Sequence, residues 1–212
     1  MSSRRRSLPT RTHLLTLITA LYAHGHRAKA FDFIRTSLQS AAIPKRFFSE
    51  LFTHLSLFLG YPAMLDGLER LHVLTPQGHS TRINPRRLPT LRSRGMGTLR
   101  KVYGNQSAKL LQHLEALQPG LGKRIAEDAY GTVMARRGLS LAEREIVNVV
   151  ALFIGGYRRQ LYSHLRGALR SGVRPAVLKS VLRSAGKIAQ KDVQREISVV
   201  DEIIRNRSKG SL

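Results

Sequence analysis

The sequence predicts an all-α fold built from two copies of one helical module, packed into a single pseudo-symmetric domain. Three observations lead to this prediction. Apolar residues recur with helical spacing in segments of about 10–17 residues that Pro and Gly separate. Alternating, strand-like runs are scarce, and the sequence aligns with itself when it is shifted by 131 residues.

The predicted helices fall into two groups along the chain. They lie near residues 11–24, 27–40, 44–59 and 62–73, and then near 106–117, 120–136, 141–154, 157–171, 174–189 and 191–206. Ser140 and Glu143 form a capping-box pattern, in which the hydroxyl and the carboxylate each satisfy a free amide of the first turn. Pro44 and Pro175 suit first-turn positions, where a missing N–H costs little.

The internal repeat lays residues 14–52 over residues 145–183 without gaps, and ten of the 39 positions are identical. Most of the identical residues are typical of packing or turn positions. The pairs are Ala20/Ala151, Leu21/Leu152, Gly25/Gly156, Arg27/Arg158, Arg35/Arg166, Leu38/Leu169, Ser40/Ser171, Pro44/Pro175, Ser49/Ser180 and Leu51/Leu182. We therefore predict a basic N-terminal arm (1–10), a degenerate N-terminal module (11–74), a basic Pro-containing linker (75–104) and a C-terminal module (105–208).

The charge of the chain is unusual, because 36 basic and 13 acidic residues give a net charge of +23. Residues 1–100 carry 16 basic and 4 acidic residues and residues 101–212 carry 20 and 9, so the whole body is cationic. Such a field attracts nucleic acid, anionic surfaces or acidic small molecules without choosing among them. The predicted linker is either a solvated connector or a polyanion-binding arm, for which the candidates are Arg82, Arg86, Arg87, Arg92 and Arg94.

The chain has no cysteine, which excludes disulfides, zinc–thiolate sites and thiol redox catalysis. The apolar run 14–23 follows three arginines and could pass for a leader, but it aligns with residues 145–154 and is expected to be a core helix. No apolar run is long enough to span a membrane.

We predict a cytoplasmic protein with no membrane association, no cofactor and no metal site. The pair His24 and His26 lacks a third ligand at helical spacing.

Residues 130–183 resemble the carboxymuconolactone decarboxylase family, which includes the AhpD-type alkylhydroperoxidases. The similar pieces are the Tyr130-Gly131 step, the GLSLAERE helix start, the Gly155-Gly156 break and the HLRGALRSG segment that ends at Gly172. Residues 13–73 resemble a second, diverged copy, with His54 in a family-like place. The resemblance implies AhpD-like helical modules. Because single-module members form rings of six, it also implies that a tandem chain forms a homotrimer.

The resemblance also implies a site. Glu145 and His164 occupy the catalytic Glu and His positions, whereas the two redox-cysteine positions hold Tyr157 and Gln160. Neither a phenol nor an amide replaces a thiolate, so peroxidase chemistry is not expected. The decarboxylase branch does not need those cysteines. The first copy has Leu14 and Phe33 opposite Glu145 and His164.

Two functions follow as hypotheses. In the first, Glu145 and His164 perform acid–base, lyase-type chemistry on a small anionic carboxylate or lactone, with His54, Tyr157, Gln160 and Arg158 binding the substrate. In the second, the chain is a non-catalytic cationic assembly that binds nucleic acid or another polyanion. A buried Glu–His pair that only satisfies itself inside the bundle is the alternative to a catalytic pair.

Overall fold

The structure of the protein is a computed structural model, and it describes residues 10–40, 43–75 and 88–208. Within those residues the secondary structure is helical and contains no strand, which confirms the all-α class. The helices are α1 (Thr10–Ala23), α2 (Arg27–Gln39), α3 (Lys45–Leu74), α4 (Leu88–Tyr103), α5 (Ser107–Leu117), α6 (Leu121–Ile125), α7 (Leu141–Gly155), α8 (Arg158–Arg170), α9 (Pro175–Ala189) and α10 (Gln194–Ser208). A 3₁₀ turn η2 (Gly104–Gln106) follows α4, and a π-helix η3 (Ala126–Met134) follows α6.

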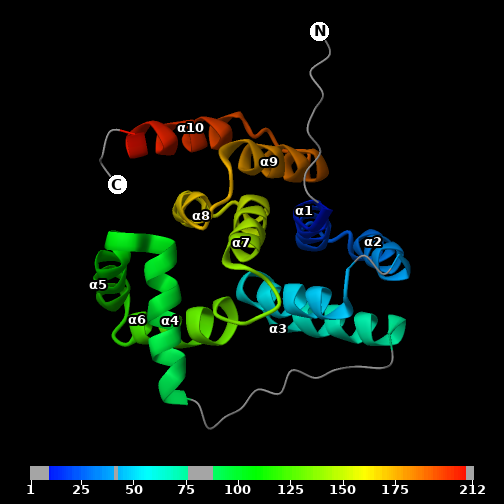
Figure 1. Cartoon of the computed structure of the whole chain (residues 1–212), viewed down its shortest axis with the longest axis horizontal. Coiled ribbons are helices and arrows are strands. Elements are labelled where there is room, and N and C mark those ends of the chain that lie inside the picture. Colours follow the sequence, from blue (N-terminus) through cyan, green and yellow to red (C-terminus); the bar gives the residue numbers. More distant parts are fainter. Residues whose placement is uncertain (1–9, 41–42, 76–87, 209–212) are drawn as a thin grey trace.

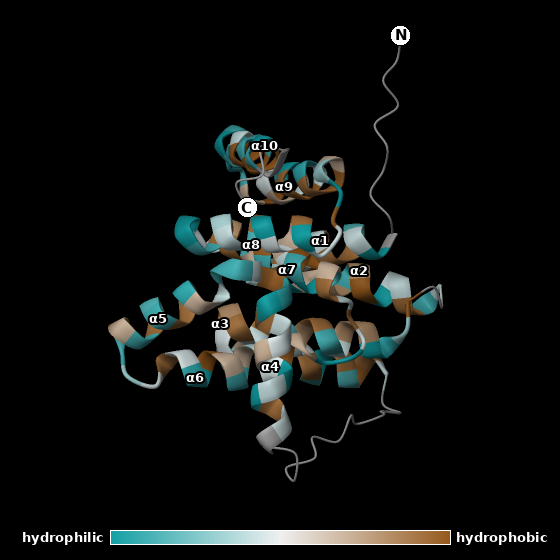
Figure 2. Ribbon diagram, turned by 60° about the vertical axis from the view of Figure 1, so that its left-hand side comes forward, coloured by the Kyte–Doolittle hydropathy of each residue, from teal (hydrophilic) through white to brown (hydrophobic). Residues whose placement is uncertain are grey.

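The helices are arranged in layers, with α7 at the centre (Figure 1). In Figure 2, α9 and α10 lie on one side of the layer formed by α8, α7, α1 and α2, and α3, α4 and α6 lie on the other side. One hydrophobic cluster contains buried residues of α1–α3 and of α7–α10, from Leu14 to Ile203. Both groups of helices therefore share one core.

The central helix α7 is the most deeply buried element, since every residue from Arg144 to Ile154 is buried. Its start is the predicted capping box: the Glu143 amide donates to Ser140 Oγ (3.2 Å) and the Ser140 amide donates to Glu143 Oε2 (2.8 Å). Eleven consecutive buried positions leave no solvent-facing side, so the polar residues among them must find partners inside the protein.

Two turns of the fold repeat each other. Gly25 after α1 has φ +89° and Gly156 after α7 has φ +76°, a left-handed conformation that favours glycine. In both turns the next amide bonds the carbonyl five residues before it, from His26 to Leu21 (2.8 Å) and from Tyr157 to Leu152 (3.0 Å). The two helix pairs that the shift of 131 residues aligns, α1–α2 and α7–α8, thus have turns of similar geometry.

The helix predictions for residues 44–59 and 62–73 correspond to one element, α3, which is interrupted at Gly60 (φ 78°, ψ 173°). The interpretation of residues 75–104 as an irregular linker is wrong from Leu88 onward, because this stretch forms α4. The proline that suggested a loop, Pro89, stands in the first turn of the helix, where its missing N–H costs little. Residues 76–87, which include Arg82, Arg86 and Arg87, lie outside the described residues.

The glycines of α4 have a packing role rather than a loop role. A Cβ at Gly95 would lie 1.8 Å from the carbonyl oxygen of Ala126, and one at Gly131 would lie 2.3 Å from the carbonyl oxygen of Leu91. Each glycine thus admits the backbone of the other helix, and α4 crosses η3 at closer range than a side chain allows. This crossing fixes η3, which contributes to the cavity described below.

The variants Gly95→Ala and Gly97→Ala test this crossing. We expect Gly95→Ala to lower the free energy of unfolding by about 3 kcal/mol, because its methyl group overlaps a backbone carbonyl that cannot turn away. Gly97 lies two residues further along α4 and has nothing within 4 Å of its added Cβ, so its alanine variant should gain about 0.5–1 kcal/mol. Urea denaturation measures both, and equal midpoints for the two variants would contradict the close crossing.

Candidate active site

A cavity of about 740 Å³ lies between α8, α5, η3 and the part of α3 before Gly60. Two kinds of side chain surround it. The polar and charged ones are Tyr103, Gln106, Lys109, His113, Tyr130, Asn148, Arg159, Gln160, Ser163, His164, Arg166 and Arg170; the apolar ones are Leu57, Phe58, Val102, Leu110, Leu114, Leu117, Ile125, Ala129 and Met134. No Asp or Glu of the described residues lines this cavity, so its electrostatic character is cationic.

Glu145 and His164 meet beside this cavity. Glu145, on α7, is fully buried, and its Oε2 lies 2.9 Å from Nδ1 of His164, on α8, which lines the cavity. Gly167, one turn after His164, makes this approach possible, because a Cβ there would lie 2.6 Å from Glu145 Oε2. The structure therefore brings together the acid and the imidazole that the sequence separates by 19 residues.

Asn148 connects this pair to the N-terminal half of the chain. Its Nδ2 lies 3.1 Å from Glu145 Oε1 and 3.1 Å from His164 Nδ1, and its Oδ1 lies 2.6 Å from Nε2 of His54, on α3. His54 is completely buried and does not line the cavity. It therefore reaches the site only through Asn148.

Hydrogen bonding has one direction along this network. The Arg144 guanidinium can only donate, so its contact with His54 Nδ1 (3.2 Å) makes that nitrogen an acceptor. Nε2 of His54 then carries the proton and donates to Asn148 Oδ1, and the Asn148 amide group turns its N–H toward Glu145. Glu145 Oε2 accepts from Nδ1–H of His164. In neutral His164, the remaining nitrogen Nε2 thus has a lone pair for the cavity.

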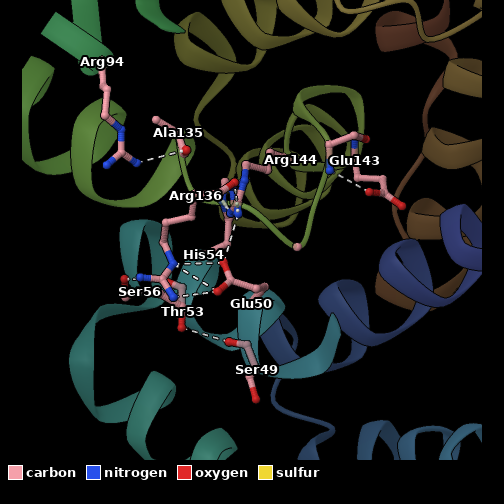
Figure 3. A network of polar contacts seen from close by, with 12 residues as sticks. Ser49, Glu50, Thr53, His54, Ser56, Arg94, Ala135, Arg136, Glu143 and Arg144 are labelled. Carbon is pink, nitrogen blue, oxygen red and sulfur yellow. Dashed lines mark hydrogen bonds and ion pairs between the residues drawn. The ribbon is translucent and has the colours of Figure 1, made fainter. Parts of the chain in front are cut away.

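A buried ion cluster holds the far end of the network (Figure 3). Nη2 of Arg144, a residue with no exposed surface, lies 3.0 Å from Glu50 Oε2 and donates to the Arg136 carbonyl (3.1 Å). Arg136 binds the same carboxylate through Nη2 (2.6 Å) and Nε (2.9 Å). Two guanidinium groups therefore share one carboxylate, and the cluster has an excess positive charge close to His54.

Burial, reinforced by the charge of Arg144, lowers the pKa of His54 to about 3. His54 is consequently neutral at physiological pH, as the direction of the hydrogen bonds requires. Burial raises the pKa of Tyr103 and of Tyr130, whose hydroxyl groups lie 3.2 Å apart. Both phenols beside the cavity are thus protonated, and since Tyr130 donates to Tyr103, the Tyr103 hydroxyl keeps its own proton for another acceptor.

The π-helix η3 contributes one wall of the cavity. Its wider turn is visible where the Ala135 amide bonds the Tyr130 carbonyl five residues earlier (2.9 Å). Ala129, Tyr130 and Met134 all line the cavity, and Met134 Sδ lies 3.7 Å from Asn148 Nδ2. The helix expected over residues 120–136 is therefore divided into α6 and η3, and η3 faces the candidate site.

Of the residues that the sequence predicted to bind substrate on or next to α8, only one lines the cavity. Gln160 lines the cavity, whereas Tyr157 and Arg158 are exposed and lie outside its lining, because they occupy the turn before α8 and its first position. Of the predicted polyanion-binding residues within the described chain, Arg92 and Arg94 are exposed on α4. Arg94 donates to the Ala135 carbonyl (3.2 Å).

Sequence reasoning missed Asn148, Arg144 and Glu50. A signal was present: Arg144, Glu145 and Asn148 are the polar residues of an otherwise apolar stretch of α7, and Glu145 and Asn148 share one face at a spacing of three residues. The partners of these residues on α3 lie more than 90 positions away in sequence. Only the fold shows that they are joined.

The described residues contain no group of three or more His, Asp or Glu side chains that could hold a metal ion. His24 and His26 lie 3.2 Å apart, from Nδ1 to Nε2, at an exposed turn far from the cavity in sequence. None of the described helices combines the length and the apolar character needed to cross a bilayer.

Comparison with known proteins supports the resemblance seen in the sequence. Residues 121–195 match the model of the carboxymuconolactone decarboxylase family. This part of the chain is similar to the carboxymuconolactone decarboxylase family. It contains α6, η3, α7, α8 and α9, and therefore both Glu145 and His164. The match does not include residues 1–120, so the second copy stays a prediction. No curated protein matches the chain.

The pH dependence of stability tests the neutral, buried state of His54. Its pKa is about 3 in the folded chain and about 6.5 in the unfolded chain, so only the unfolded chain takes up this proton between these values. The contribution of neutral His54 to the free energy of unfolding is fully present above pH 6.5. It is lost as the pH falls toward 3, with a slope of about 1.4 kcal/mol per pH unit.

The matched variant is His54→Gln, whose amide can accept from Arg144 and donate to Asn148 but does not titrate. We expect the stability of the wild type relative to this variant to fall by about 1.4 kcal/mol per unit between pH 6 and pH 4.5 in urea titrations. A difference that stays constant over this interval would show that His54 is not held neutral.

Proposed function

We propose that this protein catalyses acid–base, lyase-type chemistry on a small anionic carboxylate or lactone, without thiol peroxidase activity. His164 transfers the proton, and Glu145 orients the imidazole and stabilises its charged form. The observation that carries the proposal is the 2.9 Å contact between Glu145 Oε2 and His164 Nδ1 at the wall of a cavity. It leaves Nε2 of His164 as the nitrogen available to a substrate.

The cations around the cavity support an anionic substrate. Arg159 and Arg166, from α8, and Lys109, from α5, all line it. Nη2 of Arg166 is buried without a hydrogen-bond partner. A carboxylate would satisfy that donor and would be stabilised by the surrounding positive charge.

The phenols of Tyr103 and Tyr130 support the same chemistry. Both hydroxyl groups remain protonated because burial raises their pKa values, and Tyr103 lies against His164 with ring centroids 6.2 Å apart. A protonated phenol beside the base can donate a hydrogen bond to a carbonyl oxygen on which negative charge develops. In the proposed reaction, His164 moves the proton and the Tyr103 hydroxyl, which accepts from Tyr130, stabilises the resulting enolate-like oxygen.

Decarboxylation of carboxymuconolactone tests the proposal, with CO₂ release as the readout. We expect His164→Ala to reduce kcat/KM by about 10²-fold or more, the usual contribution of a general acid or base, and Glu145→Gln to reduce kcat more than it raises KM.

The matched variants Arg159→Ala and Arg158→Ala test whether the substrate binds in the cavity. Arg159 lines it and Arg158 does not, so only the first variant should raise KM. A folded His164→Ala protein with the wild-type rate would contradict the proposal.

Two predictions about the architecture of the protein accompany this proposal. We propose that the α1–α3 group is a diverged copy of the α7–α9 group, supported by the matching turns at Gly25 and Gly156. We also propose a homotrimer, supported by the exposed apolar residues Tyr61 and Leu65 on α3.

Polyanion binding is the second candidate function. The net charge of +23 and the exposed Arg92 and Arg94 on α4 favour it. It does not compete for the cavity, because α4 presents these two side chains to solvent and neither lines the space beside His164.

A further inference from the structure

The cavity beside His164 is large for a compact lactone. Its volume of about 740 Å³ lies within the range of about 300–1,000 Å³ that is typical of pockets for drug-sized molecules. A lactone that contacts His164 and one arginine would leave most of this space to water. The composition of the remaining wall therefore indicates what else the occupant carries.

An apolar stripe runs along the α5 wall of the cavity, beside Lys109 and His113 of the same helix. Leu110, Leu114 and Leu117 follow one another at spacings of four and three residues and form a stripe along α5. Phe58 from α3 and Ile125 from α6 line the same cavity. Leu117, at the end of the stripe, is 64% exposed, so an apolar surface extends from the cavity to solvent.

The other wall has the opposite character. Arg159, Arg166 and Arg170 project from α8, with His164 among them, and Arg166 has a buried Nη2 with no hydrogen-bond partner. No acidic side chain of the described chain lines the cavity. The cavity thus has a cationic α8 side that contains the proton-transferring imidazole, and across from it the apolar stripe of Leu110, Leu114 and Leu117.

We propose that the ligand of this site is an amphipathic carboxylate: a carboxylate or carboxylated ring bound at the α8 side, with an aliphatic or aryl tail of several carbons along the α5 stripe. This proposal deepens the proposed function, because it names the substrate class of the same site. The charge of α8 selects the head group, and burial of apolar surface against α5 supplies affinity for the tail.

Binding of a series of straight-chain acids tests the proposal without requiring turnover. Calorimetry with butanoate, hexanoate and octanoate at about 0.15 M salt should show an affinity that rises about fourfold for each methylene group that becomes buried. With 1-octanol, which has a tail of the same length and no charge, we expect binding at least tenfold weaker than with octanoate. Equal affinities for octanoate and butanoate, or for octanoate and octanol, would overturn the proposal.

Two matched pairs of variants locate the binding. Leu114→Ser should remove the dependence on chain length and leave butanoate binding unchanged, whereas Val73→Ser, on the surface of α3, should change neither. Arg166→Gln should weaken octanoate about tenfold and leave octanol unchanged, whereas Arg158→Gln, outside the lining, should have no effect. Leu117→Ser gives the same test at an exposed position, where folding is not at risk.

The results separate this proposal from its rivals. If Leu117→Ser leaves octanoate affinity unchanged but dissociates an oligomer in sedimentation experiments, the stripe is an interface between copies of this chain and the proposal is wrong. If the acids show no dependence on length while carboxymuconolactone turnover depends on His164, the acid–base function stands and the amphipathic ligand does not. If affinity rises with the length of the acid but carboxymuconolactone turnover does not depend on His164, the amphipathic ligand stands and the acid–base function does not.

Discussion

The buried guanidinium of Arg144 is the constraint on which the rest of the site depends. It has no exposed surface and can only donate hydrogen bonds; Nη1 and Nη2 find acceptors inside the protein, whereas the buried Nε has none. Glu50 and His54 from α3 and the Arg136 carbonyl before α7 are those acceptors. Removing one partner of such a cluster leaves an uncompensated buried charge, which typically costs about 3–5 kcal/mol. Arg144 thus ties α3 to the start of α7 and sets the proton positions beyond it.

This arrangement gives the two groups of helices different tasks. The C-terminal group contains Glu145 and His164, and the N-terminal group, with Leu14 and Phe33 at the equivalent sequence positions, contributes His54 and Glu50 from α3 instead. These two residues do not touch the cavity. They hold Asn148 in the orientation that directs its N–H toward Glu145, so the N-terminal group acts on the site by positioning rather than by contact.

Much of the fold was predictable from local signals, and less of the site was. The capping box at Ser140 and the interruption at Gly60 are encoded by neighbouring residues, and the resemblance to the decarboxylase family pointed to Glu145 and His164. The helix at Leu88 was missed because its prolines and its run of cations indicated a linker, whereas Gly95 packs this helix against η3, about 30 positions away. The polar residues Asn148 and Arg144 stood out in an apolar stretch, but their partners on α3 are about 90 positions away and no local pattern indicates them.

Nitrogen-15 NMR of histidine-labelled protein at about pH 7.5 tests the directional network most directly, because the two ring nitrogens of each tautomer have distinct shifts. The variants His54→Gln and His164→Gln assign the two rings among the eight histidines. We expect the two rings to be opposite tautomers, with the proton on Nε2 in His54 and on Nδ1 in neutral His164. A proton on Nε2 of neutral His164, or a protonated His54, would contradict it.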